Sequence, residues 1–193
     1  GEYEYHDVGM VNDKYFVYVV GAGTFTKVSY MTKQRMKRVL GKVAYVVDGV
    51  HELVHPTLID GKLIVDEKEI EFKKSPLVLV LNSRSVAGLP FNKRGHLNDG
   101  YFDVIVLKKY FGSIFSIGRL MLFGVKKNKD HTRYYDFYRG VKIKIEIDEN
   151  IPWTLDGEEG PKGSLNIENL HHYFRIYARE NSKHFLKNDR VKK

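Results

Sequence analysis

The chain has 193 residues, of which 42% are hydrophobic and 29% are charged, and its formal net charge is +8. This composition is that of an ordinary globular protein, and the length suits one substantial domain. The absence of cysteine excludes a disulfide framework, a thiolate nucleophile and a cysteine-ligated zinc or iron–sulfur site. The positive charge favours a polyanionic partner, whether nucleic acid, nucleotide phosphates or an anionic membrane surface.

The N-terminal quarter predicts one strand, a glycine turn and one helix. Residues 14–21 are β-branched and aromatic, which indicates a buried strand, and Gly21-Ala22-Gly23 indicates a turn after it. Between residues 32 and 53 apolar residues recur three or four apart, as on one face of a helix. The first half of this helix carries five basic residues and no acid. Such a face is compatible with solvent, nucleic acid or a membrane surface.

The rest of the chain has mostly β patterns. Short alternating segments predict strands at residues 57–59, 62–66 and 69–73, with a hairpin turn at Asp60-Gly61. The apolar residues 77–82 predict a central strand. After a loop at residues 86–97 we expect a second helix at 110–126 and further strands at 101–107, 138–147, 153–155, 164–172 and 173–179.

These elements together predict a mainly β (α+β) fold. We expect an antiparallel β-sandwich-like domain over residues 1–180, with two to three helices, and a frayed basic tail at residues 181–193. The longest apolar-rich run, residues 110–125, is interrupted by glycine, serine and arginine. It is too short to span a bilayer.

One acidic turn lies in the segment HLNDGYFDV, from His96 to Val104. A plain turn explains it, because Asn98 and Asp99 can bond their own backbone and Gly100 can adopt a positive φ. The same segment also fits a hard-cation site, in which one carboxylate and neighbouring backbone carbonyls supply oxygen ligands. The residues alone leave both interpretations open.

A second acidic turn is TLDGEEG, from Thr154 to Gly160. Asp-Gly is a common hairpin turn. Asp156 and Glu158 are two residues apart, so on an extended segment both carboxylates would lie on one face. Paired carboxylates raise one another's pKa and so produce a candidate general base. A simple hairpin remains the alternative.

Two other patterns are better explained by structure than by function. GAGTFT, from Gly21 to Thr26, follows a strand but fits neither GxxxxGK[ST] nor GxGxxG, so it predicts no nucleotide site. The pairs His51/His55 and His171-His172 belong to no HExxH pattern and are interpreted as ordinary surface histidines.

Five segments in order resemble one family: YFVYVVGAGTFTKVSY, KRVLGKVAYVVDGVHEL, NSRSVAG, LNDGYFDV and LDGE. They are similar to the C-terminal domain of the bacterial soluble diacylglycerol kinases and their lipid-kinase relatives, which include sphingosine and ceramide kinases. The likeness covers residues 7–178 and lies in the order and spacing of the segments.

The resemblance implies a role for each acidic turn. Asp156 would be the base that deprotonates a lipid hydroxyl, and Glu158 would support the magnesium and water network around the phosphates. Asp99 would hold a structural Mg²⁺ through its carboxylate, together with backbone oxygens around His96 and Tyr101.

The resemblance also implies a second domain. The family carries a Gly-Gly-Asp-Gly-Thr phosphate loop in a separate N-terminal nucleotide-binding domain, and no such segment occurs in this chain. We therefore expect ATP to be bound mainly by that absent domain, and this chain alone to be inactive.

The expected activity is transfer of phosphate from ATP to a lipid hydroxyl, with diacylglycerol as the acceptor and phosphatidic acid as the product. A sphingosine-like or phosphatidylglycerol-type acceptor stays open. The expected place is the cytoplasm, peripheral at the inner membrane face, and the expected partners are the lipid and the nucleotide-binding domain. Nucleic acid is not an expected partner, and a homodimer through an edge strand stays open. The alternative is a non-catalytic module that binds anionic lipid or nucleic acid.

Overall fold

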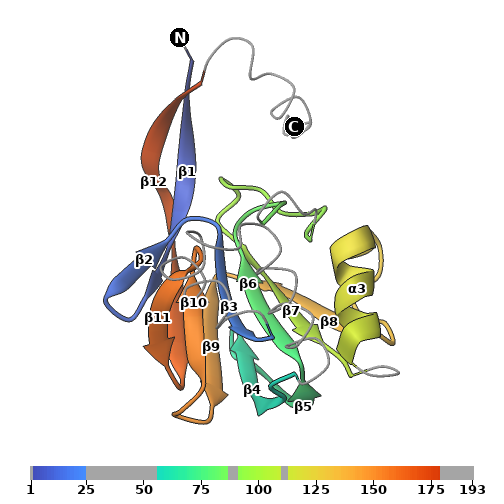
Figure 1. Ribbon diagram of the computed structural model, residues 1–193. Helices are drawn as coiled ribbons and strands as arrows, with labels where there is room; N and C mark the ends of the chain where they lie inside the picture. Colours follow the sequence, from blue (N-terminus) through green and yellow to red (C-terminus); the bar gives the residue numbers. More distant parts are fainter. Residues whose placement is uncertain (1, 25–55, 87–90, 110–112, 179–193) are drawn as a thin grey trace, which may run out of the picture.

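The computed structural model describes residues 2–24, 56–86, 91–109 and 113–178, which form two antiparallel six-stranded sheets packed face to face and one helix (Figure 1). The helix expected at residues 32–53 and the tail at 181–193 lie outside the described residues. Among the described residues, no helix has the length and apolar character to cross a membrane. The expected mainly β, sandwich-like α+β fold is confirmed.

The first sheet has the strand order β2-β1-β12-β9-β4-β5. Its strands are β1 (Glu2–Val11), β2 (Lys14–Phe16), β4 (Ile59–Val65), β5 (Lys68–Ser75), β9 (Lys142–Ile147) and β12 (Leu165–Ala178). β1 and β12 pair from Glu2↔Ala178 to Val11↔Ile167. Their outer halves extend beyond the sandwich as a two-stranded ribbon (Figure 1).

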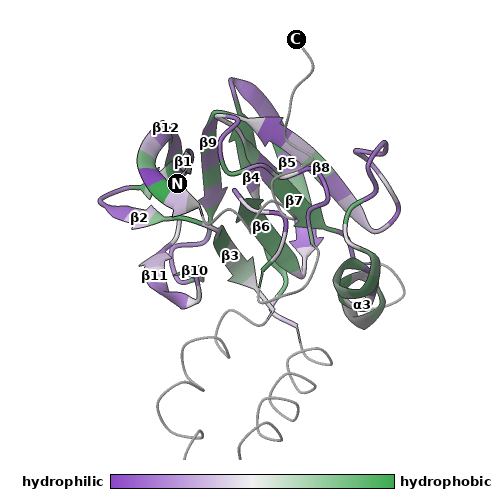
Figure 2. Ribbon diagram, turned by 90° about the horizontal axis from the view of Figure 1, so that it is seen from above, coloured by the Kyte–Doolittle hydropathy of each residue, from purple (hydrophilic) through white to green (hydrophobic). Residues whose placement is uncertain are grey.

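The second sheet has the strand order β11-β10-β3-β6-β7-β8. Its strands are β3 (Val19–Gly23), β6 (Leu77–Leu81), β7 (Phe102–Leu107), β8 (Tyr135–Gly140), β10 (Pro152–Leu155) and β11 (Glu158–Lys162). β3, β6 and β7 are buried along their whole length and are strongly hydrophobic (Figure 2). The central strand predicted at residues 77–82 is therefore confirmed.

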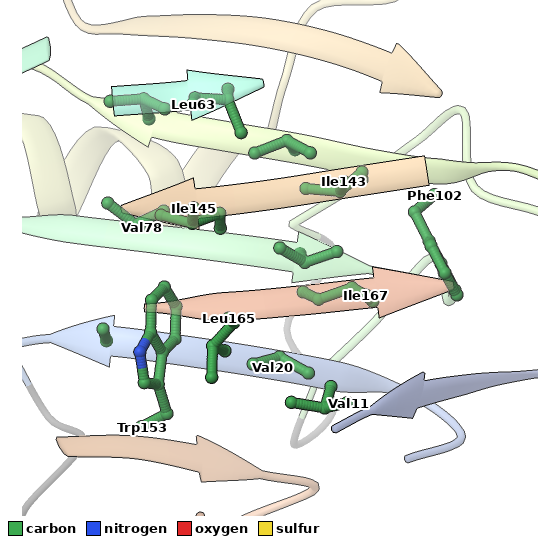
Figure 3. Close-up of a cluster of buried hydrophobic side chains, with 14 of the residues drawn as sticks. Val11, Val20, Leu63, Val78, Phe102, Ile143, Ile145, Trp153, Leu165 and Ile167 are labelled. Carbon is green, nitrogen blue, oxygen red and sulfur yellow. The ribbon is translucent and has the colours of Figure 1, made fainter. Parts of the chain in front are cut away.

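The main core fills the space between the sheets (Figure 3). Trp153 from the second sheet is fully buried there, and its Nε1 donates a hydrogen bond to the Gly163 carbonyl at 2.7 Å. A second core lies on the opposite face of the second sheet. There α3 (Ser113–Phe123) packs Ile117 and Leu120 against the sheet, so both faces of β6 and β7 are covered.

The turn predicted at Gly21-Ala22-Gly23 is wrong, because these residues are buried in β3. Ala22 pairs with Trp153 of β10 on one side and with Val78 of β6 on the other. A Cβ added at Gly21 would lie 3.0 Å from Leu79 Cδ2. The glycine therefore permits close side-chain packing on a central strand. The strand predicted at residues 14–21 is also divided, since β2 and β3 belong to different sheets.

The hairpin predicted at Asp60-Gly61 is also wrong. Both residues lie inside β4, where its pairing with β5 shifts register between Ile59 and Gly61, as at a β-bulge. The turn lies at Asp66-Glu67, with φ of 45° and 74°. Positive φ at both central residues defines the type I′ turn that suits a two-residue hairpin. Asp-Glu is a weaker sequence signal for this turn than Asp-Gly.

The strand predicted at residues 138–147 is two strands that lie in different sheets. The chain crosses from β8 to β9 at Val141. A Cβ at Gly140 would lie 2.4 Å from Val65 Cγ1, so the crossing needs glycine. The strands predicted at 164–172 and 173–179 are one continuous strand, β12, while β1 and β11 were not predicted.

Candidate functional site

Asp156 lies at the tip of the β10–β11 hairpin. Leu155 pairs with Glu158, and the two turn residues, Asp156 and Gly157, have φ of 49° and 86°, which is again a type I′ turn. The Asp-Gly turn predicted from the sequence is therefore confirmed. The Asp156 amide donates to the Val19 carbonyl at 2.8 Å, which fixes the hairpin against the start of β3.

Three backbone amides hold the Asp156 carboxylate. Val17 N donates to Oδ2 at 2.6 Å, and Tyr18 N and Val19 N both donate to Oδ1 at 2.8 Å. A carboxylate has about four lone-pair sites. The amides use two of these sites on Oδ1 and one on Oδ2, so among the described residues one lone pair on Oδ2 is left to accept a further proton. The carboxylate is thus fixed in orientation at an exposed turn.

Glu158 follows on β11 and is exposed. The turn separates it from Asp156, so the two residues do not share the face of an extended segment as the sequence argument assumed. Among the described residues, the hydrogen-bond partners of the Asp156 side chain are the three amides and no second carboxylate. The structure does not test the catalytic roles of Asp156 and Glu158, which remain predictions.

The second predicted site is the loop before β7. Tyr101 N donates to Asp99 Oδ1 at 3.1 Å, and Gly100 has a φ of 75°, so the turn expected at Asn98-Asp99-Gly100 is present. His96 is half-buried at the start of this loop, and Tyr101 is 45% exposed at its end. The loop therefore places Tyr101 and His96 close to Asp99.

Asp99 carries a charge that its surroundings do not favour. Burial raises the pKa of Asp99, and the Tyr101 amide and the Arg139 guanidinium offset this effect only in part. Arg139 Nη1 lies 3.5 Å from Asp99 Oδ2. An oxygen-rich loop with one incompletely compensated carboxylate suits a hard cation such as Mg²⁺. The residues present therefore fit the ion that the resemblance implies.

An ion pair on the second sheet, with a buried carboxylate and a partly exposed guanidinium, lies beside this loop. Arg139 donates to Asp103 from Nε at 2.7 Å and from Nη2 at 3.1 Å, and Asn92 Nδ2 donates to the same carboxylate at 2.6 Å. Asp103 is 2% exposed. The hydrogen bond to Asp103 is the main cause that raises the pKa of Arg139. Arg139 thus joins the buried Asp103 to the neighbourhood of Asp99.

Asp7 and Asn82 connect the two predicted sites. Asp7 is fully buried; its amide donates to the Leu97 carbonyl at 2.6 Å, and its Oδ2 accepts from Gly100 N at 2.7 Å. Asn82 Nδ2 donates to the carbonyls of Asp7 and Val17, both at 3.0 Å. Since Val17 N also binds Asp156, a continuous set of hydrogen bonds runs from the Asp156 turn to the Asp99 loop.

One buried polar atom in this connection lacks a partner. Among the described residues, no group donates a hydrogen bond to Asn82 Oδ1, although the side chain is 1% exposed. Leaving a buried acceptor unsatisfied costs about 1–3 kcal/mol. An ordered water or a cation would remove that cost, as expected of a site that holds an ion network.

The sequence prediction missed four residues of this region: Asp7, Asn82, Asp103 and Arg139. Asn82 lies in the NSRSVAG segment, which was linked to the family without a role for any one residue. Asp7 carried no signal, because its partners are 93 and 165 positions away along the chain.

Comparison with known proteins agrees with the resemblance. A search of protein-family models found no match. Over 180 residues the chain is 31% identical to a diacylglycerol kinase of Bacillus subtilis (strain 168), which covers 88% of this chain and 55% of that protein. A diacylglycerol kinase of Staphylococcus epidermidis (strain ATCC 12228 / FDA PCI 1200) is 27% identical over 193 residues, which is 96% of this chain and 58% of that protein.

A solved structure extends the agreement to the fold. A diacylglycerol kinase from Bacillus anthracis str. Sterne matches with a TM-score of 0.69 at 22% identity, over 94% of this chain and 58% of that one. The chain thus spans a little over half the length of these proteins. The chain is similar over nearly all of its length to the bacterial diacylglycerol kinases, and the resemblance read from its sequence is confirmed.

Proposed function

We propose that this chain is the C-terminal, substrate-side domain of an ATP- and magnesium-dependent lipid kinase whose acceptor is diacylglycerol. The observation that carries the proposal is the exposed Asp156 carboxylate, held by three amides, with one lone pair on Oδ2 unused among the described residues. The relatives named diacylglycerol kinase support the reaction class.

In this proposal Asp156 accepts the proton of the attacking lipid hydroxyl. The protein contributes to phosphoryl transfer mainly by positioning the reactants and neutralising charge. A carboxylate that accepts the hydroxyl proton also positions the attacking hydroxyl. The amides of Val17, Tyr18 and Val19 prevent the carboxylate from rotating away from the hydroxyl. Bound Mg²⁺ would neutralise phosphate charge; Glu158 would support that ion and its water network, and Asp99 would hold a structural ion.

A lipid substrate needs an apolar surface, and the outer side of α3 offers one. Phe115, Leu122 and Phe123 are 62%, 74% and 58% exposed on the helix whose other side packs on the second sheet. The exposed residues Lys126, Lys127 and Lys129 follow directly. Apolar and basic groups side by side suit acyl chains below anionic headgroups, which supports peripheral binding at the cytoplasmic face of a membrane.

The proposed partner is the nucleotide-binding domain. The chain spans 55–58% of its relatives, which leaves room for such a domain in them. The ribbon of β1 and β12 presents Tyr3, Tyr5 and Tyr177, each at least 50% exposed, outside the sandwich (Figure 1). Aromatic residues are enriched at interfaces, so this ribbon is a suitable surface for the missing domain. A homodimer through an edge strand stays a prediction.

The test is phosphate transfer from ATP to diacylglycerol in mixed micelles, with the full-length protein. We expect Asp156→Asn to lower kcat by about 10²–10⁴, the usual contribution of a general base. Glu159→Gln, on the same hairpin and paired with Thr154, should stay near the wild-type rate. Transfer that persists in Asp156→Asn would remove Asp156 from catalysis. No transfer in the wild type, with salt-sensitive binding to anionic liposomes or oligonucleotides, would favour the binding-module alternative.

A further inference from the structure

An irregularity between β1 and β12 brings two histidines together. His6 pairs with Phe174 and Val8 with Leu170, so three residues of β12 (171–173) lie opposite Asp7 alone. His172 has a φ of 52°, which is uncommon for a residue other than glycine. In a regular strand neighbouring side chains point to opposite faces. Here the two imidazoles stack on one another, with ring centroids 3.6 Å apart and planes 27° apart.

The buried carboxylate of Asp7 orients the first imidazole. His171 Nδ1 lies 2.8 Å from Asp7 Oδ1, which also accepts from His172 N at 2.8 Å. An ionised carboxylate can only accept, so the neutral imidazole places its proton on Nδ1 and leaves the lone pair of Nε2 available. A carboxylate, a histidine and an ion in line are the common arrangement by which proteins fix a metal-binding imidazole.

The second imidazole supplies another nitrogen. Both histidines are exposed, and among the described residues no hydrogen bond to a ring nitrogen of His172 is formed. One ligand atom from each of Asp7, His171 and His172 lies within 4.8 Å of the other two. Two nitrogens on one Zn²⁺ are at most about 4.2 Å apart, since each bond is about 2.0–2.1 Å. The rings are stacked with their centroids 3.6 Å apart and direct their in-plane lone pairs nearly in parallel, so one ring must turn about its Cβ–Cγ bond for both nitrogens to face the same ion.

We propose that His171 and His172 bind a divalent transition ion of the Zn²⁺ type, with Asp7 as the residue that orients His171. Zinc, nickel and copper ions bind well to imidazole nitrogens, whereas Mg²⁺ prefers oxygen ligands. This site is therefore distinct in chemistry from the oxygen-rich loop of Asp99. The two are neighbours, because Asp7 also binds Gly100 N, and a Cβ at Gly100 would lie 3.3 Å from His171 Nδ1.

The test is calorimetric titration of the 193-residue chain with Zn²⁺ in excess Mg²⁺. We expect one ion per chain at the tightest site. His172→Asn keeps a residue type that tolerates the positive φ, and it should weaken this binding by about 10–100-fold, the range seen when metal-site groups are removed. His171→Gln should do the same, with folding of both variants checked by circular dichroism.

The matched control is His131→Gln. His131 Nδ1 lies 2.9 Å from Asp136 Oδ1, so it is an exposed histidine on a carboxylate, but without a stacked second imidazole. Its loss should leave zinc affinity unchanged. The proposal is overturned if the wild type binds no zinc, if excess Mg²⁺ displaces the zinc, or if His171→Gln and His172→Asn bind as tightly as the wild type. These outcomes are independent of lipid phosphorylation.

Discussion

Removal of Arg139 tests whether the Asp103–Arg139 pair holds the Asp99 loop in place. In Arg139→Met, Asp103 stays buried at 2% exposure and keeps only Asn92 Nδ2 as a donor among the described side chains. A hydrogen bond to a charged group contributes about 1.5–3 kcal/mol, and breaking a buried pair costs about 3–5 kcal/mol.

The Arg139 side chain is 37% exposed, so solvent reduces this effect. We expect the free energy of unfolding to fall by about 2–3 kcal/mol, and Tm by roughly 5–10 °C for a chain of this size. Urea denaturation monitored by Trp153 fluorescence gives the free energy of unfolding, and thermal unfolding monitored by circular dichroism gives Tm.

The control is Lys144→Met, which removes an exposed ion pair with Glu146. Exposed pairs contribute about 0–1 kcal/mol, so this variant should be nearly as stable as the wild type. Asp103→Asn in the Arg139→Met background removes the unpaired charge and should recover part of the loss. A loss below about 0.5 kcal/mol for Arg139→Met would refute the reasoning that the buried carboxylate depends on this guanidinium.

The remaining predictions concern the cation loop and two glycines. Because burial raises the pKa of Asp99 above 3.8, the folded state binds more protons there than the unfolded state. Without Mg²⁺, the Tm of the wild type should then fall as the pH rises from 3.8 through the pKa of Asp99 in the folded state. Asp99→Asn should abolish this fall. At a Mg²⁺ concentration ten times Kd, the free energy of unfolding of the wild type should rise by about 1.4 kcal/mol. That of Asp99→Asn should not change. An equal rise in both proteins would exclude Asp99 as a ligand. Gly9→Ala should lose about 1–3 kcal/mol in urea denaturation, since its Cβ would collide with the buried Phe16 ring. Gly118→Ala adds a Cβ into open space on α3 and should raise the free energy of unfolding by about 0.5–1 kcal/mol. If both glycine substitutions changed the free energy of unfolding in the same direction, the packing argument would be contradicted.

Sequence patterns predicted the elements that consist mostly of apolar residues. The strands β6 and β7 and the helix α3 are such elements, and each was found near its predicted place. The ribbon was missed for a related reason. The segment Glu2-Tyr3-Glu4-Tyr5-His6 alternates charged and aromatic residues, and its tyrosines stay exposed, so no apolar face marks a strand. Glycines misled the turn predictions, because Gly21 and Gly61 serve close packing within strands.

The residues of the candidate site also fall into a group that the sequence predicted and a group that it did not. Both acidic turns were found, because Asp-Gly is a local signal that requires no knowledge of the fold. The residues that connect them were not found, because their positions depend on pairing between distant strands. Asp7 meets His171 across 164 positions, and Val17 meets Asp156 across 139. Composition and spacing carry no information about such contacts.

Asn82 is where the two turns can be tested as one unit. Its side chain binds the carbonyls of Asp7 and Val17 at 3.0 Å, so it lies between the backbone that holds the Asp99 loop and the backbone that holds Asp156. Asn82→Ala leaves both carbonyls without this donor, at a cost of about 1–3 kcal/mol for the buried Asp7 carbonyl and less for the half-buried Val17 carbonyl. If the turns act together, the variant should weaken Mg²⁺ binding and also lower kcat by about 10–100-fold, because small misplacements of catalytic groups have effects of that size.

Ser75→Ala is the control, since Ser75 lies just before the start of β6, is 1% exposed, and its Oγ donates to the Leu77 carbonyl at 3.0 Å. It should lose stability but retain Mg²⁺ affinity and kcat. If Asn82→Ala also loses only stability, the two turns are independent and the hydrogen bonds between them are structural. If it changes both binding and rate while Ser75→Ala changes neither, a buried amide at the end of β6 couples the two acidic turns into one site.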